Sequence, residues 1–297
     1  MKKKKEVRVG KIDLDTVGTA FLLGVTRADK VEVLRDGKAS PEDLADPSVI
    51  CIEVGGSGQV QLNNWDHHGE KELRSATFQA YTWRMSQLEE PTISPKLCLL
   101  VDYIDLIDTK GPQALRNVKV EFPTLSEVFS GMLLTIRDPV EQLHRGVEIL
   151  REVLNARIFP LGRMPIKGRK YRDWAVYAKA KTENNRQVAE AVKEAWWAAT
   201  RSGLKLAWLE TDFFGAPGAL YGVGAQVVVA FSPHFGPNKI PKFTVAGNGI
   251  RIDGILAELN TREPGWGGPG SGTIIGSPRE GSRMTLDEVV EIVKKVL

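Results

Sequence analysis

Residues 48–54 constrain the fold of this chain more than any other stretch. They form an apolar run rich in β-branched side chains, which is typical of a strand buried on both faces of a parallel sheet. Residues 6–9 and residues 30–34 have the patterns of two further strands, and residues 17–25 carry apolar side chains at helical spacing between them. This order of elements predicts right-handed crossovers and an α/β fold built on a parallel sheet.

Acidic side chains stand at the carboxyl ends of two of these predicted strands. Asp13 and Asp15 follow the first strand, and Glu53 lies at the end of the buried one. Ligands gather at the carboxyl ends of strands in such sheets. We therefore expect the three carboxylates to converge. Asp15 also has a purely structural explanation, because an aspartate there can cap the helix that follows.

Asp66, His67 and His68 form a run of metal-binding residue types. The chain has four histidines, and half of them lie in this dipeptide. One hard oxygen ligand beside two imidazole nitrogens is a donor set suited to a metal ion. The alternative is that the two rings simply cap a strand or bond a backbone carbonyl.

A predicted helix over residues 94–108 carries three more acids. Asp102, Asp105 and Asp108 are spaced by three residues, so each points about sixty degrees away from the last and they cannot all face one ion. Asp102 lies deepest in the apolar run. We therefore expect Asp102 to be the ligand and the other two to lie at the surface or behind the site.

These acid-bearing stretches, taken in order, resemble the signature of the DHH phosphoesterase superfamily. Its members include RecJ-type single-strand exonucleases, nanoRNases, cyclic-dinucleotide phosphodiesterases and manganese-dependent pyrophosphatases. The resemblance implies an α/β protein with a parallel-sheet DHH domain followed by a smaller α/β C-terminal domain. It rests on Asp13-x-Asp15, Glu53, Asp66-His67-His68 and Asp102.

The resemblance also implies a function: metal-dependent hydrolysis of phosphodiester bonds in nucleotides or in short or single-stranded oligonucleotides. A carboxylate-rich site with one or two imidazoles favours Mn²⁺ or Mg²⁺ over structural zinc. His68 and Asp66 are the expected catalytic residues, with His68 contacting the phosphate or protonating the leaving group. The expected metal ligands are Asp13, Asp15, Glu53, Asp66, His67 and Asp102.

The chain departs from the superfamily pattern at two positions of this site. Val9 stands where a histidine usually precedes the first aspartate pair, and Glu53 replaces the usual aspartate. A DHH protein that binds a nucleotide or oligonucleotide, or another protein, without hydrolysis is therefore the alternative function. An unrelated α/β protein with a chance Asp-His-His triplet is a third interpretation.

A glycine-rich stretch near the C-terminus resembles the substrate-binding motif of the superfamily's C-terminal domain. Pro269 stands where that motif commonly has a histidine. Glycines of this kind can present backbone amides to an anion. The expected substrate-binding residues are Gly267, Gly268, Gly270 and Gly272.

Composition and length set the remaining expectations. A chain of 297 residues can form two domains, and we predict a DHH-type domain at 1–156, a linker rich in proline, glycine and basic residues at 157–172, and a C-terminal domain at 173–297 that begins with a strand over 174–180. The net charge of +3 makes no separate case for nucleic acid. With no apolar run of membrane-spanning length, we expect a cytoplasmic protein, a nucleotide or single-stranded oligonucleotide partner, no membrane and, as an open possibility, a homodimer.

Overall fold

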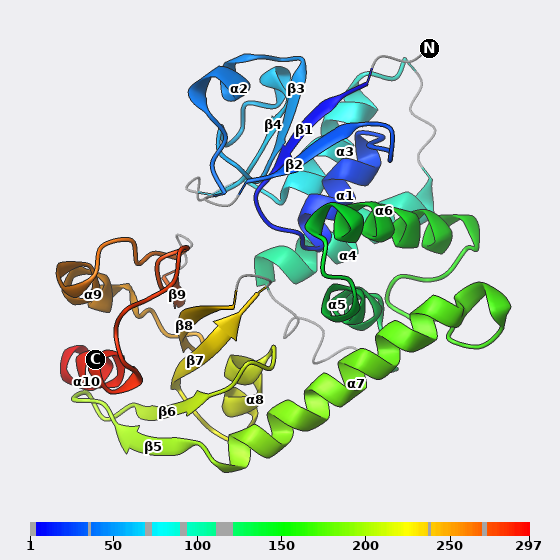
Figure 1. The fold of residues 1–297 in the computed structure, drawn as a ribbon. Helices are drawn as coiled ribbons and strands as arrows, with labels where there is room; N and C mark the ends of the chain where they lie inside the picture. The colour runs from blue at the N-terminus through cyan, green and yellow to red at the C-terminus, as the bar shows by residue number, and fades with distance from the viewer. Residues whose placement is uncertain are drawn as a thin grey trace. The chain divides into compact units, whose positions relative to one another are not determined.

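The chain folds into two compact units, Met1–Lys181 and Thr182–Leu297, each with its own sheet (Figure 1). The predicted linker at 157–172 lies within the first of them. The expected α/β class, a parallel-sheet domain followed by a smaller α/β domain, is confirmed. The structure is a computed structural model that describes residues 4–34, 37–68, 73–89, 94–110, 121–236, 239–268 and 272–297.

The first unit is built on a four-stranded parallel sheet with strand order β2-β1-β3-β4. All four residues of β3 are buried, in agreement with its apolar sequence. Because the strands are parallel, their carboxyl ends lie at one edge of the sheet. The strands are β1 (Glu6–Val9), β2 (Lys30–Val33), β3 (Val49–Ile52) and β4 (Asn64–Trp65).

Six helices of the described chain accompany this sheet. Helix α1 contacts α3, α4 and α6, and this packing encloses a core that includes Trp65, Leu100 and Leu150. Asp13 caps α1, since its side chain accepts a hydrogen bond from the Thr16 amide at 3.0 Å. The helices are α1 (Leu14–Leu22), α2 (Pro41–Ala45), α3 (Ala76–Ser86), α4 (Pro95–Lys110), α5 (Leu125–Thr135) and α6 (Pro139–Asn155).

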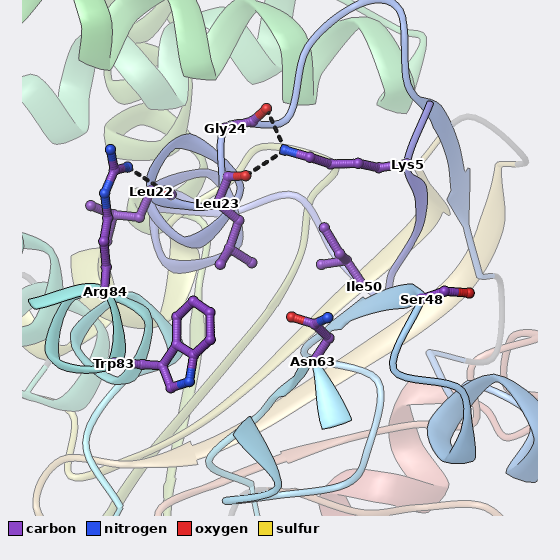
Figure 2. A pocket seen from close by; sticks show the side chains of 9 residues that line it. All are labelled: Lys5, Leu22, Leu23, Gly24, Ser48, Ile50, Asn63, Trp83 and Arg84. Carbon is purple, nitrogen blue, oxygen red and sulfur yellow. Dashed lines mark hydrogen bonds between the residues drawn. The ribbon is translucent and has the colours of Figure 1, made fainter. Parts of the chain in front are cut away.

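A pocket of about 530 Å³ lies at the opposite, amino end of β1 and β3 (Figure 2). Two cations on its wall cap the C-terminus of α1. Lys5 Nζ donates to the carbonyls of Leu23 and Gly24 at 2.6 and 2.8 Å, and Arg84 donates to the carbonyl of Leu22 at 2.6 Å. The nine described residues that line the pocket include no acid and no histidine, so it is not the predicted metal site.

The predicted strand over residues 174–180 is wrong, because this segment belongs to the long helix α7 (Arg172–Lys193). Trp174, Tyr177 and Ala178 are all buried, and their spacing of three and four residues is that of one helix face. Helix α5 approaches this turn closely at Gly131, where a Cβ atom would overlap the backbone of Tyr177.

The second unit contains a mixed sheet with strand order β5-β6-β7-β8-β9, in which only β6 and β7 are parallel. Leu206, Val227 and Phe243 are fully buried in its core. In the parts of the chain that the structure describes, no helix has the length and apolarity needed to cross a bilayer. The elements are β5 (Trp196–Ala199), β6 (Lys205–Glu210), α8 (Ala216–Gly222), β7 (Val227–Phe235), β8 (Ile240–Gly247), α9 (Leu256–Arg262), β9 (Ile274–Gly276) and α10 (Leu286–Val296).

Candidate metal centre

Four side chains of the first unit meet beyond the carboxyl ends of β1, β3 and β4. The Nε2 atom of His67 lies 3.2 Å from Glu53 Oε1, 3.2 Å from Asp108 Oδ2 and 3.8 Å from Asp15 Oδ2. We call Asp15, Glu53, His67 and Asp108 the His67 cluster. Two groups of three residues have donor atoms within 4.8 Å of one another: Asp15, His67 and Asp108 form one, and Glu53, His67 and His68 form the other, so His67 is common to both.

Asp15 is held by the start of helix α3. Its Oδ1 atom accepts a hydrogen bond from the Thr77 amide at 2.7 Å, and its Oδ2 atom accepts one from the Ala76 amide at 2.8 Å. A carboxylate there satisfies amides that the helix leaves unpaired. Asp15 therefore joins α1 to α3 and is not the cap of its own helix.

Glu53 reaches the cluster from a strained backbone position immediately after β3. Its φ of 57° lies in the left-handed region, which is uncommon for a residue other than glycine. Gly10 lies opposite, and a Cβ atom there would stand 2.7 Å from the Glu53 carbonyl oxygen. The tight turn that presents Glu53 therefore depends on a glycine after β1.

Asp66 supports the site from behind the cluster and lies outside both donor groups. Its Oδ2 atom accepts from the Gly55 amide at 2.6 Å, and its Oδ1 atom accepts from the His68 amide at 2.7 Å and pairs with His68 Nδ1 at 2.9 Å. These bonds fix the imidazole of His68. That side chain is 54% exposed and is open to a ligand from solvent.

Asp102, the expected ligand from α4, does not reach the cluster. Its side chain is 63% exposed and lies 3.7 Å from Arg74. Asp105 is bound to Arg74 at 2.7 Å and to the Ser75 amide at 3.0 Å. Asp108, which we expected at the surface or behind the site, is the acid that contacts His67.

The helical phase explains this correction. Val101 and Ile104 are buried, and Asp108 continues their stripe at spacings of three and four residues. Asp102 is next to this stripe in sequence, yet it lies about 100° away around the helix. Depth within an apolar run therefore did not predict which acid of α4 contacts His67, whereas Asp108 lies in phase with the buried residues.

Asp13 also lies outside the two donor groups. One of its oxygens accepts from the Thr16 amide, and the other lies 2.8 Å from Lys11 Nζ. Neither oxygen contacts His67 among the described ion pairs. The first aspartate of the pair therefore caps a helix and binds a lysine, whereas the second joins the cluster.

The predicted substrate-binding glycines lie in the second unit, apart from Gly270, which is outside the described residues. Gly267 forms a β-bridge with Gly276, so its amide is already bonded at 3.1 Å. A Cβ atom on Gly268 would overlap the Ile274 carbonyl, and Gly272 has a φ of 65°. Close packing accounts for glycine at 268 and backbone conformation for glycine at 272, whereas a Cβ atom at 267 would meet nothing within 4 Å.

Three buried polar atoms of the His67 cluster have no hydrogen-bond partner: Glu53 Oε1, His67 Nε2 and Asp108 Oδ2. Unpaired buried polar atoms are costly, and His67 Nε2 lies 3.2 Å from each of the other two. Neighbouring ligands of an octahedral ion bound at about 2.1 Å lie about 3 Å apart. The residues that could hold one divalent cation are the two groups of three whose donor atoms lie within 4.8 Å of one another, each of which includes His67.

The electrostatics of the cluster also favour a cation. Burial raises the pKa of Asp15, and the nearby Glu53 and Asp108 raise it further. Burial likewise raises the pKa of Glu53. For His67, burial lowers the pKa, but Asp108 and Glu53 outweigh it and raise the pKa to about 11. A cation among these carboxylates would offset their mutual repulsion.

We predict that Mn²⁺ binding releases a proton from His67. The free imidazole has a pKa of about 11 and is protonated at neutral pH, whereas a metal ion needs the neutral ring. Apparent affinity should therefore rise with pH below this pKa, by up to about tenfold per pH unit. Calorimetric titration in two buffers of different ionisation enthalpy should detect about one proton per ion. An affinity independent of pH would contradict the prediction.

Comparisons with known proteins identify a solved structure that shares the fold of this chain. No protein-family model and no curated protein sequence matches the chain. A solved structure of a pGpG-specific phosphodiesterase from Vibrio cholerae matches with a TM-score of 0.56 and 12% identity, and the match covers 97% of this chain and 96% of that one.

Two further solved structures match less closely. A DHH-domain protein described as a member of a family of ribosomal proteins has a TM-score of 0.43 and 14% identity, over 98% of this chain and 85% of that one. An uncharacterised protein from Helicobacter pylori G27 has a TM-score of 0.34 and 13% identity, over 98% and 99%. The match with the Vibrio cholerae structure shows that the two chains share an α/β fold.

Proposed function

We propose that the chain is a divalent-metal-dependent phosphodiesterase that hydrolyses a dinucleotide or another short single-stranded oligonucleotide. The observation that carries this proposal is that buried donor atoms without a hydrogen-bond partner on Glu53 and Asp108 each lie 3.2 Å from His67 Nε2, and that His67 belongs to two groups of possible metal ligands. Carboxylates with an imidazole suit Mn²⁺ or Mg²⁺. When bound, such an ion lowers the pKa of a water molecule and offsets charge on the phosphate.

Residues of the protein would bind the ion and donate a proton to the leaving group. His67 would hold the ion together with Asp15 and Asp108, and Glu53 would lie beside it, 3.2 Å from His67 Nε2. Hydrogen bonding to Asp66 raises the pKa of His68, which favours protonation of its ring. Because its Nδ1 atom is paired with Asp66, Nε2 is the ring nitrogen left to donate a proton to the leaving oxygen of a substrate.

The centre favours one ion over two. Val9, at the carboxyl end of β1, is fully buried in the hydrophobic core and adds no ligand. Asp13, on the same loop, lies outside both donor groups and pairs with Lys11. The donor atoms that remain are those around His67.

The choice of substrate follows from the matched fold. The Vibrio cholerae protein is a pGpG-specific phosphodiesterase, and its match with this chain covers nearly all of both proteins. That supports pGpG as the first compound to test, with a longer oligoribonucleotide and a cyclic dinucleotide beside it. All three compounds contain a phosphodiester bond between nucleosides.

The test is hydrolysis of these three compounds with Mn²⁺, with Mg²⁺ and with chelator. We expect cleavage of at least one linear compound with Mn²⁺, its loss on chelation and its recovery when metal is restored. If the metal-loaded protein binds a nucleotide tightly and cleaves none of the three, it is instead a non-catalytic nucleotide-binding protein.

A further inference from the structure

Lys11 is a cation beside the centre that ion binding leaves unused. It lies in the loop between β1 and α1, and its Nζ atom is 2.8 Å from Asp13 Oδ2. Its side chain is 77% exposed. The ammonium also interacts electrostatically with Glu53 and Asp108 of the His67 cluster. The Lys11 ammonium is therefore close enough to the His67 cluster to interact with its carboxylates, and it is accessible to a ligand.

Asp13 holds this ammonium in place. Its other oxygen accepts the capping hydrogen bond from Thr16 at 3.0 Å, so the carboxylate is anchored to the first turn of α1. An ammonium has three donors, and the ion pair with Asp13 leaves others free for a second acceptor. Anchoring lowers the entropy that the flexible lysine side chain loses when it binds a ligand.

Two other basic residues among those that the structure describes in the first unit are committed elsewhere. Arg74 is bound to Asp105 and lies over the ring of Phe78 at 3.3 Å. Lys5 donates to two carbonyls at the amino end of the sheet. A phosphate that approaches the His67 cluster meets several carboxylates, and an exposed lysine there reduces the repulsion.

We propose that Lys11 binds a phosphate oxygen of the substrate and that Asp13 is the positioning residue that holds its ammonium. Lysine is a common phosphate ligand in proteins and acts as a compact point charge. The inference rests on the proposed function, because it places the phosphate at the same centre. It assigns Asp13 to substrate binding through Lys11 instead of to the metal ion.

The test is calorimetric binding of 5′-GMP to the Mn²⁺-loaded protein and to Lys11→Met, which keeps the length of the side chain and removes the charge. We expect affinity for 5′-GMP to fall on the order of tenfold to a hundredfold, as for loss of a charged hydrogen bond. Lys11→Arg should recover most of it. Lys30→Met is the matched control, since Lys30 is an exposed lysine at the start of β2 and should leave the affinity unchanged.

Mn²⁺ affinity provides the second measurement. Lys11→Met and Asp13→Asn should each bind Mn²⁺ within about threefold of the original protein, whereas loss of a metal ligand costs more than tenfold. A drop of more than tenfold in Asp13→Asn would overturn the assignment of Asp13. Binding of 5′-GMP by Lys11→Met within twofold of the original protein, or no binding by the original protein itself, would overturn the assignment of Lys11.

Parallel assays of pGpG hydrolysis separate the two proposals. Metal-dependent hydrolysis with unchanged 5′-GMP binding in Lys11→Met contradicts only the role of Lys11. Absence of hydrolysis, with 5′-GMP binding that depends on Lys11, contradicts the proposed enzyme and supports the phosphate contact.

Discussion

Replacing His67 with glutamine should abolish Mn²⁺-dependent hydrolysis for practical purposes. His67 Nε2 contacts Glu53 and Asp108 at 3.2 Å and is common to both donor groups, so its loss leaves no three-ligand set intact among the described residues. Metal ions contribute several kcal/mol of transition-state stabilisation, and about 4 kcal/mol corresponds to roughly a thousandfold in rate. The measurement is kcat/KM for pGpG together with bound Mn²⁺ per chain.

The control for this change is His234→Gln. His234 is an exposed histidine of β7 in the second unit, and it pairs with Asp212 at 3.0 Å much as His68 pairs with Asp66. It contacts no member of the His67 cluster among the described ion pairs. Hydrolysis should therefore persist in His234→Gln. If His67→Gln keeps its activity within tenfold, the His67 cluster is not the catalytic centre.

Two acids of one helix give the second large effect. Asp108→Asn should weaken Mn²⁺ binding by at least about tenfold to a hundredfold, the range known for groups that support metal ligands. Asp102→Asn should leave the Mn²⁺ affinity within about twofold of the original protein, because the exposed charge of Asp102 is screened by water. Both changes remove one negative charge from α4. A difference in Mn²⁺ affinity between the two variants therefore reflects where the charge lies relative to the centre and not the net charge of the helix.

Mn²⁺ affinity can be measured for both variants by calorimetry or by the electron paramagnetic resonance of the free ion. Thermal unfolding without metal checks that each variant folds. A larger loss of Mn²⁺ affinity in Asp102→Asn than in Asp108→Asn would mean that Asp102 is the metal ligand from α4.

The backbone at Glu53 connects the fold to the centre. Strained residues persist where the surrounding structure holds them, and they are frequent at functional sites. Here the parallel pairing of β3 with β1 and the absence of a side chain at Gly10 hold the turn. Glu53 has one methylene more than aspartate, and the left-handed turn presents its longer side chain to His67.

The sequence alone determined the class of the fold and the region of the centre. The buried run of β3 and the acids after β1 and β3 predict a parallel sheet with carboxylates at one edge, because the period and order of apolar residues already encode strand burial and chain direction. The Asp66-His67-His68 triplet marked the imidazoles. None of these inferences required knowledge of the packing between distant helices.

The tertiary structure decided which acid does what. Asp13, Asp15 and Asp66 lie in motifs that look equivalent in sequence, yet of these three only Asp15 contacts His67. Each carboxylate has a different partner: Asp13 pairs with Lys11, Asp15 binds amides of α3, and Asp66 pairs with His68. Asp108, and not Asp102, contacts His67, because the packing of α4 on the rest of the first unit fixes its rotation. Spacing along the chain gives the order of polar groups, whereas their bonding partners come from segments far apart in sequence and exist only once the chain has folded.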